Sequence, residues 1–341
     1  MSRKLNLKNI FIVSLLILTA YSFFPMIFFL FTAPAGNDDN NQANAAKLRG
    51  NAGFYFSFIV FGDNHAGLIF NDASALKLIW NMNREDRFRK VPLDFVLSAG
   101  DVSLNGKERH FTAYKKLQNI IKYPVIAAIG NHDDRELFKK YCGDPQFAFP
   151  DRNSYFIVVD NEGGPPDFEW LEKELEKGKS YSHIFIVMHK PPFDPYQRDW
   201  YNADSAPWAY KFRKLCSENK VDMVFSGHKH MFARRKFDGV ENIVTGGGGM
   251  LIEIPEANGG YLNYVRVVVN HEYVTYEVRK VSPPLWLHMT YYLGKEALYW
   301  IRNWYGSGYI SGRDREVFPP RIRDMDNYEY WFNEKGNIKE D

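Results

Sequence analysis

The chain has 341 residues, of which 45% are hydrophobic, and its formal net charge is +2. This length allows one catalytic domain of about 230 residues with extensions, and the hydrophobic content is enough to fill its core. The near-neutral charge and the lack of a basic stripe argue against a nucleic-acid partner. The two cysteines, Cys142 and Cys216, form no CxxC motif, so a cysteine metal site is not expected. A disulfide between them is possible, but two unpaired, half-buried thiols are the simpler interpretation.

The chain opens with a long apolar segment. No charged residue lies between Lys8 and Asp38, and the run Ile10 to Ala33 exceeds the roughly 20 residues that a membrane-spanning helix needs. Basic residues precede the run, so residues 1–9 are expected to stay cytoplasmic and the catalytic domain to be extracytoplasmic. Ala33-Pro34-Ala35 resembles a signal-peptide cleavage site, which makes a secreted or periplasmic protein the alternative. The length of the run favours an uncleaved transmembrane signal anchor over 10–33.

Residues 34–52 follow this anchor and are rich in Asn, Ala, Asp and Gly. They show no apolar periodicity, so they predict a flexible linker that holds the next domain away from the membrane.

Residues 53–282 alternate strand-like apolar runs with amphipathic helical patterns. Strands are expected over 56–60, 95–97, 125–129, 155–159, 184–187 and 221–225. Helices are expected after Asn71 or Asp72, after Asn105-Gly106, after Asp133 or Asp134, and over 168–177 and 208–217. Asp133 itself is interpreted as a helix cap, with catalytic support as the alternative.

The pattern then changes to antiparallel strands. Asp238-Gly239 is a hairpin signal between 232–237 and 240–244, and a second pair is expected over 264–269 and 273–281. The glycine run 246–249 lacks the ending of a phosphate-binding P-loop and is interpreted as a strand-end turn. Together these elements predict an α+β domain in which two packed sheets lie between outer helices.

Polar residues that commonly bind metals follow five of the apolar runs. Because ligands bind at the carboxyl ends of strands in α/β sheets, these side chains are expected to lie near one another. They are Asp63 and His65 after the first run, Asp101 after the second, Asn131 and His132 after the third, His189 after a later one, and His228 and His230 after the last.

The series D-x-H, G-D, G-N-H-D, H and G-H-x-H, in this order, resembles the calcineurin-like metallophosphoesterase superfamily. The resemblance spans about residues 54–282 and implies an αββα four-layer sandwich of two mixed β-sheets. It also implies a dinuclear metal centre with Asp101 bridging the two sites. One cation would be held by Asp63, His65, Asp101 and His230, and the other by Asp101, Asn131, His189 and His228. Such mixed nitrogen and oxygen ligands suit Mn, Fe or Zn better than Ca.

The same resemblance implies hydrolysis of phosphoester bonds. A metal-bridging hydroxide would attack phosphorus, and His132 would protonate the leaving oxygen, a task suited to an imidazole. In serine/threonine protein phosphatases a second Asp follows the G-D motif, but Gly100 to Gly106 contains none. Leu104 stands where purple acid phosphatases carry a tyrosine ligand. These departures favour the phosphodiesterase-like group.

Three functions remain open from the sequence. A phosphodiesterase is favoured, with a small-molecule or lipid-headgroup phosphoester as substrate. A phosphomonoesterase with the same site is the alternative, and a non-catalytic metal-binding module is the third. The loop Pro191 to Pro207 carries Phe193 and other aromatic residues, and it is either a substrate wall or a packed surface loop. The extension 283–341 begins with a helical stripe, Trp286, Met289 and Leu293, which predicts packing against the domain or contact with a membrane interface.

Overall fold

The computed structural model describes residues 39–48, 53–85, 91–195, 207–252 and 254–294. No helix within these ranges has the length and apolar character needed to cross a membrane. The anchor predicted over 10–33 lies outside the described residues, as do most of the linker, residues 196–206 of the aromatic loop and the extension beyond Gly294.

The first sheet has the strand order β11-β10-β1-β2-β3. Its strands are β1 (Phe56–Phe61), β2 (Leu93–Ser98), β3 (Val125–Ala127), β10 (Leu262–Val269) and β11 (Val274–Val281). β1, β2 and β3 are parallel, whereas β10 runs antiparallel to β1 and pairs with β11 in a hairpin. The antiparallel pair predicted over 264–269 and 273–281 is therefore confirmed.

The second sheet has the order β4-β5-β6-β7-β9-β8. Its strands are β4 (Phe147–Asp151), β5 (Ser154–Val158), β6 (His183–Val187), β7 (Met223–Ser226), β8 (Phe232–Phe237) and β9 (Val240–Thr245). β5, β6, β7 and β9 are parallel, and the Asp238-Gly239 hairpin is confirmed. β4 was not predicted from the sequence because Pro150 interrupts its pattern; it is an edge strand, where a missing N–H is tolerated.

Aromatic side chains fill the space between the two sheets. The Phe58 ring lies 5.3 Å from that of Phe95 in the first sheet and 5.1 Å from that of Phe185 in the second, centroid to centroid. Phe156 and Phe225 also contact Phe58. Alternate residues of each strand point into this layer because side chains alternate across a strand. The phenylalanines therefore fix how the two sheets face each other.

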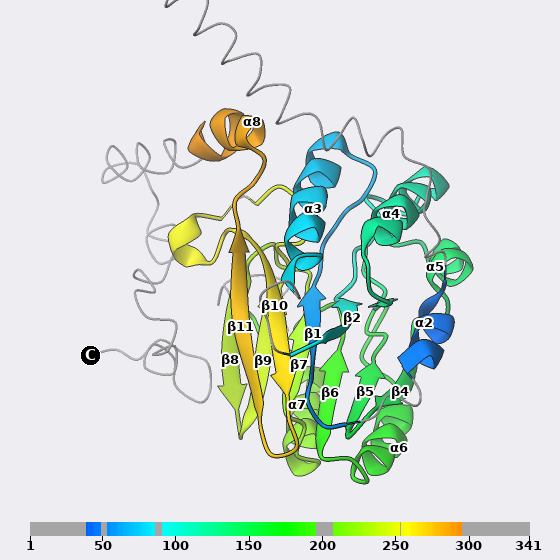
Figure 1. Cartoon of the computed structure of the whole chain (residues 1–341). Coiled ribbons are helices and arrows are strands. Elements are labelled where there is room, and N and C mark those ends of the chain that lie inside the picture. The colour runs from blue at the N-terminus through cyan, green and yellow to red at the C-terminus, as the bar shows by residue number, and fades with distance from the viewer. Residues whose placement is uncertain (1–38, 49–52, 86–90, 196–206, 253, 295–341) are drawn as a thin grey trace, which may run out of the picture.

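Helices cover the outer faces of both sheets (Figure 1). α3 (Ile69–Met82), α4 (Glu108–Ile120) and α5 (Arg135–Cys142) pack on the first sheet, and α6 (Phe168–Gly178) and α7 (Pro207–Glu218) pack on the second. The helices expected after Asn71 or Asp72 and after Asn105-Gly106 are α3 and α4, and each buries an apolar face. A 3₁₀ turn (Glu256–Asn258) precedes β10, and α8 (Leu285–Leu287) continues into the π-helical turn η4 (His288–Tyr292). The predicted α+β architecture, with two mixed sheets flanked by helices, is confirmed.

The prediction of a flexible linker over 34–52 is wrong for residues 41–48, which form helix α2 (Asn41–Leu48). Asn41 explains why. Its side-chain amide donates to the carbonyl of Ala127 and accepts from the Ala127 N–H, both at 2.8 Å, and Asn44 donates to the carbonyl of Val125. These side-chain amides hydrogen-bond to the backbone of β3, which is an edge strand. The asparagines that suggested a solvated linker thus satisfy backbone groups at the edge of the sheet.

Candidate metal centre

The metal-ligand residue types lie at the carboxyl ends of the parallel strands, where Figure 1 shows β1, β2, β5 and β6 pointing the same way. Four of them have backbone conformations that non-glycine residues rarely adopt. Asp63, His65, Asp101 and His228 have φ of 63°, 45°, 51° and 68°. Such conformations are costly and persist where the surrounding structure enforces them, commonly at functional sites.

Hydrogen bonds join the turns that carry these residues. The Asp63 N–H donates to the Gly100 carbonyl and the His65 N–H to the Asp101 carbonyl, each at 3.0 Å. Gly100 itself has φ of 91°, and a Cβ there would lie 2.6 Å from His189 Nδ1. Glycine is therefore required for the second turn to pass so close to His189.

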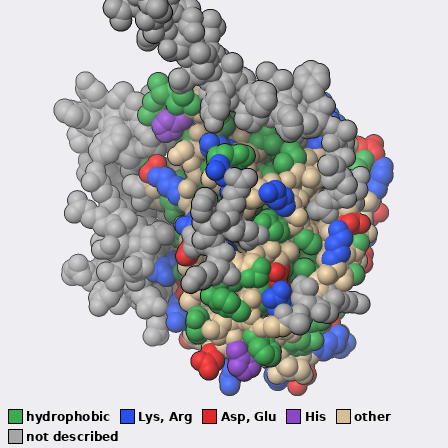
Figure 2. Space-filling model, viewed as in Figure 1, with side chains coloured by type: hydrophobic (Ala, Val, Ile, Leu, Met, Phe, Trp, Pro, Cys, Tyr) green, Lys and Arg blue, Asp and Glu red, His purple; other side chains and the backbone are tan. Residues whose placement is uncertain are grey.

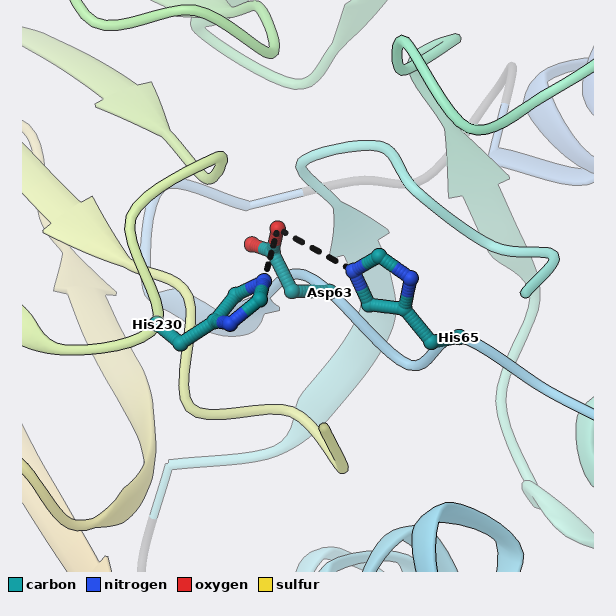
Figure 3. A group of neighbouring side chains, drawn as sticks. All are labelled: Asp63, His65 and His230. Carbon is teal, nitrogen blue, oxygen red and sulfur yellow. Dashed lines mark ion pairs between the residues drawn. The ribbon is translucent and has the colours of Figure 1, made fainter. Parts of the chain in front are cut away.

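Asp63, His65 and His230 form the first group (Figure 3). Asp63 Oδ1 lies 3.8 Å from His65 Nε2 and 3.6 Å from His230 Nε2. The backbone N–H of His228 donates to both oxygens of the Asp63 carboxylate at 3.0 Å, which fixes its orientation. Asp63 and His65 are fully buried, whereas His230 is partly exposed.

Asp101 links this group to a second one. Asp101 Oδ2 lies 3.4 Å from His65 Nε2 and 3.2 Å from His189 Nε2. Asn131 Oδ1 lies 3.0 Å from the same His189 nitrogen and 2.7 Å from His228 Nδ1. One carboxylate thus lies between two sets of side chains, which is the arrangement that a bridging ligand requires.

The environment of His189 indicates a cation. Its Nδ1 donates to the Ala99 carbonyl at 2.8 Å, so in the neutral ring Nε2 carries no hydrogen and faces oxygens of Asp101 and Asn131. Burial lowers the pKa of His189, but the charge of Asp101 outweighs burial and raises it to about 10. The metal-free site therefore holds a proton at a position where a divalent cation can replace it.

The remaining imidazoles carry different charges in the metal-free site. Burial, together with the charge of His189, lowers the pKa of His228 to about 2, and burial lowers the pKa of His230 to about 4. Burial also opposes protonation of His65, but Asp63 and Asp101 raise its pKa above the ordinary value. Two neutral imidazoles are thus already present, and the neutral ring is the form in which histidine binds metals.

A further observation indicates that these side chains suit divalent cations. Both ring nitrogens of His65 are buried and make no hydrogen bond. Buried polar atoms are normally satisfied, so an unsatisfied imidazole between two carboxylates indicates a missing partner of positive charge. The ligand atoms of Asp63, Asp101 and His189 also lie within 4.8 Å of one another.

His132 lies at the exposed rim of this cluster. Its Nδ1 donates to the carbonyl oxygen of Leu104 at 2.8 Å, and its backbone N–H donates to Asp101 Oδ1. Leu104 belongs to the stretch that lacks the second Asp, so a backbone carbonyl supplies the orienting acceptor. No sequence signal marks a backbone acceptor. One His132 ring nitrogen is also within 4.8 Å of ligand atoms of His65 and Asp101, which makes a direct metal contact the alternative role.

The interpretation of Asp133 as a helix cap is wrong. Asp134 caps α5 by accepting from the Leu137 N–H at 2.9 Å. The Asp133 carboxylate instead accepts from the N–H groups of Val102, Ser103 and Gly130. It therefore fastens the Asp101 turn to the Asn131 turn. Loss of water around the carboxyl group and the charge of Asp101 raise the pKa of Asp133 to about 7.

Packing also bears on three other interpretations of the sequence. The glycine run after β9 is a strand-end turn: the Gly248 N–H donates to the Gly62 carbonyl, and a Cβ at Gly248 would lie 2.1 Å from that oxygen. Phe193 is 1% exposed and packs near Phe237, so it belongs to the core and forms no substrate wall. Cys142 and Cys216 are unpaired, as expected, but fully buried.

Comparison with known proteins agrees with this geometry. Residues 56–232, just over half of the chain, match the model of the calcineurin-like phosphoesterase family. A probable cyclic nucleotide phosphodiesterase of Rhodopseudomonas palustris is 28% identical over 157 residues, 40% of this chain and 56% of that protein. A probable glycerophosphodiester phosphodiesterase of Arcobacter nitrofigilis is 23% identical over 37% of this chain and 52% of its own length. Purple acid phosphatase 5 of Arabidopsis thaliana is 28% identical over 41% of this chain and 37% of its length.

Solved structures show the same fold. A purple acid phosphatase from yellow lupin superposes with a TM-score of 0.51 at 17% identity, over 68% of this chain and 53% of that one. The matches to the curated relatives span between about a third and just over half of their lengths. The family match covers the strands and turns that carry the metal-ligand residues up to His230. The chain belongs to the calcineurin-like phosphoesterase family.

Proposed function

We propose that this protein hydrolyses phosphodiesters at a two-metal site. One observation carries the proposal: the side chains after β1, β2, β3, β6 and β7 converge on Asp63 and Asp101, and the buried ring nitrogens of His65 between these carboxylates make no hydrogen bond. The names of similar proteins include two phosphodiesterases, which supports the reaction class.

The residues divide between two cations as the family pattern implies. Asp63, His65 and His230 would hold one, and Asn131, His189 and His228 the other, with Asp101 shared. When bound, these cations would neutralise the anionic phosphate and lower the pKa of a water molecule that attacks phosphorus. The nitrogen and oxygen donors favour Mn, Fe or Zn.

His132 would act on the leaving group. Its Nδ1 is committed to the Leu104 carbonyl, so Nε2 is the ring atom that can carry the exchangeable proton. As the ester P–O bond breaks, Nε2 would donate this proton to the leaving oxygen, and the exposed ring would regain a proton from water. A neutral carbonyl thus orients the imidazole where an aspartate does so in other enzymes.

Diester hydrolysis is favoured over monoester hydrolysis by His65. His65 is buried between Asp63 and Asp101. Leu104 stands at the position that carries a tyrosine ligand in purple acid phosphatases, and its backbone carbonyl contacts His132. Phosphomonoester hydrolysis at the same site is the alternative, because purple acid phosphatases are also among the similar proteins.

The test compares turnover of bis(p-nitrophenyl) phosphate with that of p-nitrophenyl phosphate after loading with Mn. The proposal expects the diester to have the higher kcat/KM. A higher kcat/KM for the monoester would contradict the proposal and assign phosphomonoester hydrolysis to this site. Absence of turnover of both in a metal-loaded protein would support the non-catalytic module.

We also propose that the domain is held on the extracytoplasmic side of a membrane by the segment 10–33. The apolar length of that segment and the basic residues before it support this location. Protease accessibility of the domain in intact cells tests it, since a cytoplasmic domain would be protected.

A further inference from the structure

An apolar surface lies at the end of the domain that carries the metal centre. We define it by five exposed side chains on two neighbouring helices: Ile69, Phe70, Leu285, Met289 and Leu293, which are between 39% and 59% exposed. They make up half of the large exposed hydrophobic residues in the described part of the chain. α3 and α8 lie side by side in Figure 1, and hydrophobic side chains gather over α8 in Figure 2.

The surface has the pattern of an amphipathic helix with its apolar stripe outward. Leu285, Met289 and Leu293 are spaced four residues apart and lie on one side of the helical turns from 285 to 294. The other side is anchored in the core by Leu287 and Tyr292, which are 1% and 6% exposed. Leu287 and Tyr292 therefore attach these turns to the core, and the outward stripe lies on the opposite side from that contact.

Contacts between the helices make the surface continuous. The Phe70 ring lies 5.5 Å from that of Trp286, centroid to centroid. Ile69 begins α3 only four residues after His65, and Asn71 donates to the His65 carbonyl at 3.0 Å. The apolar surface is thus tied directly to the first metal-ligand turn.

The chain upstream of the domain enters at this same end. Asn41 pairs with Ala127 at the carboxyl end of β3, whereas Asn44 pairs with Val125 at its start. α2 therefore begins near the carboxyl ends of the strands and runs away from them. The apolar run that precedes it ends at Ala33, and the six steps from there to Asp39 span at most about 20 Å.

We propose that this apolar surface rests on the interface of the lipid bilayer in which the segment 10–33 is anchored. A short connection to the metal-centre end brings that end toward the membrane. Exposed apolar stripes of this kind gain free energy by entering the headgroup region. The metal centre then faces the lipid surface, so its substrates would include phosphoesters presented by lipid headgroups.

The test uses the full chain reconstituted in vesicles of phosphatidylcholine and phosphatidylglycerol. A nitroxide is attached to the variants Met289→Cys and Ile69→Cys, and collisions with oxygen and with a water-soluble nickel chelate are measured. Cys142 and Cys216 are 3% and 1% exposed, so the introduced thiol is the reactive one. Tyr210→Cys is the matched control, because Tyr210 is 68% exposed and lies on α7, which packs on the second sheet and not on the helices of the apolar surface.

We expect the ratio of oxygen to nickel collisions to be several-fold higher at both test positions than at position 210, because oxygen partitions into the bilayer. Equal ratios would overturn the proposal. Shielding from both reagents would overturn it too, since another protein segment or a second copy would then cover the surface. Failure of the chain to bind the vesicles would do the same. The readout is independent of turnover, so it separates this proposal from the proposed reaction.

Discussion

Strand β6 carries a histidine near each end, and the two differ in what their ring nitrogens meet. At the start of the strand, His183 Nδ1 lies 3.1 Å from Asp222 Oδ1, and its Nε2 lies 2.8 Å from the Asn270 carbonyl oxygen. Both ring nitrogens therefore have hydrogen-bond partners. His189, two residues after its end, faces the oxygens of Asp101 and Asn131 with a nitrogen that lacks a hydrogen in the neutral ring. We therefore interpret His183 as structural, whereas His189, whose Nε2 lies among oxygens that can also bind a cation, is a candidate ligand.

The carboxylates show the same contrast. Asp222 accepts from the backbone N–H of Ile184 and contacts His183, so it closes a local network at the amino end of β6. Asp101 accepts one backbone N–H, from His132, and otherwise faces two imidazoles. Burial alone would raise the pKa of Asp101, but the charges of His189 and His65 outweigh it and lower the pKa.

The largest expected effect comes from Asp101→Asn. Because Asp101 lies between both groups, this variant should lose bound metal and lower kcat/KM by more than about 100-fold, since even changes behind a metal ligand cost about 10- to 100-fold. Metal content by mass spectrometry and diester turnover measure it. Asp222→Asn is the matched control and should keep both. Equal metal content in the two variants would show that Asp101 is no more important for metal binding than Asp222.

His132→Ala should lower turnover by about 10²- to 10⁴-fold, the usual contribution of a general acid, while bound metal is retained. The loss should be large for diesters with alkyl leaving groups and small for p-nitrophenyl esters, whose leaving oxygen needs no proton. Turnover of the two substrate classes, measured beside metal content, checks this. Metal loss as large as in Asp101→Asn would make His132 a ligand.

Metal binding should release protons near neutral pH. The pKa of His189 is raised to about 10, so its ring is protonated in the metal-free protein and must give up a proton to bind. The pKa of His65 is raised as well, by Asp63 and Asp101. Apparent affinity for Mn should therefore rise as pH increases toward 10 and fall as pH decreases. Calorimetry in buffers of different ionisation enthalpy counts the released protons. Affinity that does not change with pH would show that the lone pairs were already available.

The smallest effect is expected at His183. Burial lowers its pKa, but the Asp222 carboxylate and the Asn270 carbonyl raise it above the ordinary value. A histidine with a raised folded pKa stabilises the fold below its unfolded pKa and loses that contribution as pH rises through the folded one. His183→Gln should thus cost on the order of 1 kcal/mol at about pH 5.5 and less at about pH 9. Urea unfolding at both pH values measures it; a cost that grows with pH would contradict the sign.

Much of the site was predictable because its residues follow strands at fixed positions. Asp63, Asp101 and His189 each come directly after an apolar run, and parallel strands place their carboxyl ends together. The glycine before Asp101 also follows from the need for a tight approach to His189. The pattern of residue types in chain order was therefore enough to predict the fold and to predict which side chains lie together at the candidate metal centre.

Other features depend on contacts that no local pattern encodes. The carbonyl of Leu104 orients His132, and Leu104 could be another residue without changing that oxygen. Asp133 receives backbone donors from a turn some 30 residues away, whereas its neighbour Asp134 caps the helix. Asn41 pairs with a strand edge 86 residues along the chain, which its own asparagine-rich surroundings concealed. These partners appear only when the tertiary structure is known.

Anomalous diffraction from crystals soaked in Mn tests the central claim most directly. The account predicts a pair of manganese peaks on either side of the Asp101 carboxylate, one among Asp63, His65 and His230 and the other among Asn131, His189 and His228. Absence of peaks there, or peaks only at other acidic positions such as Asp222 beside His183, would contradict it.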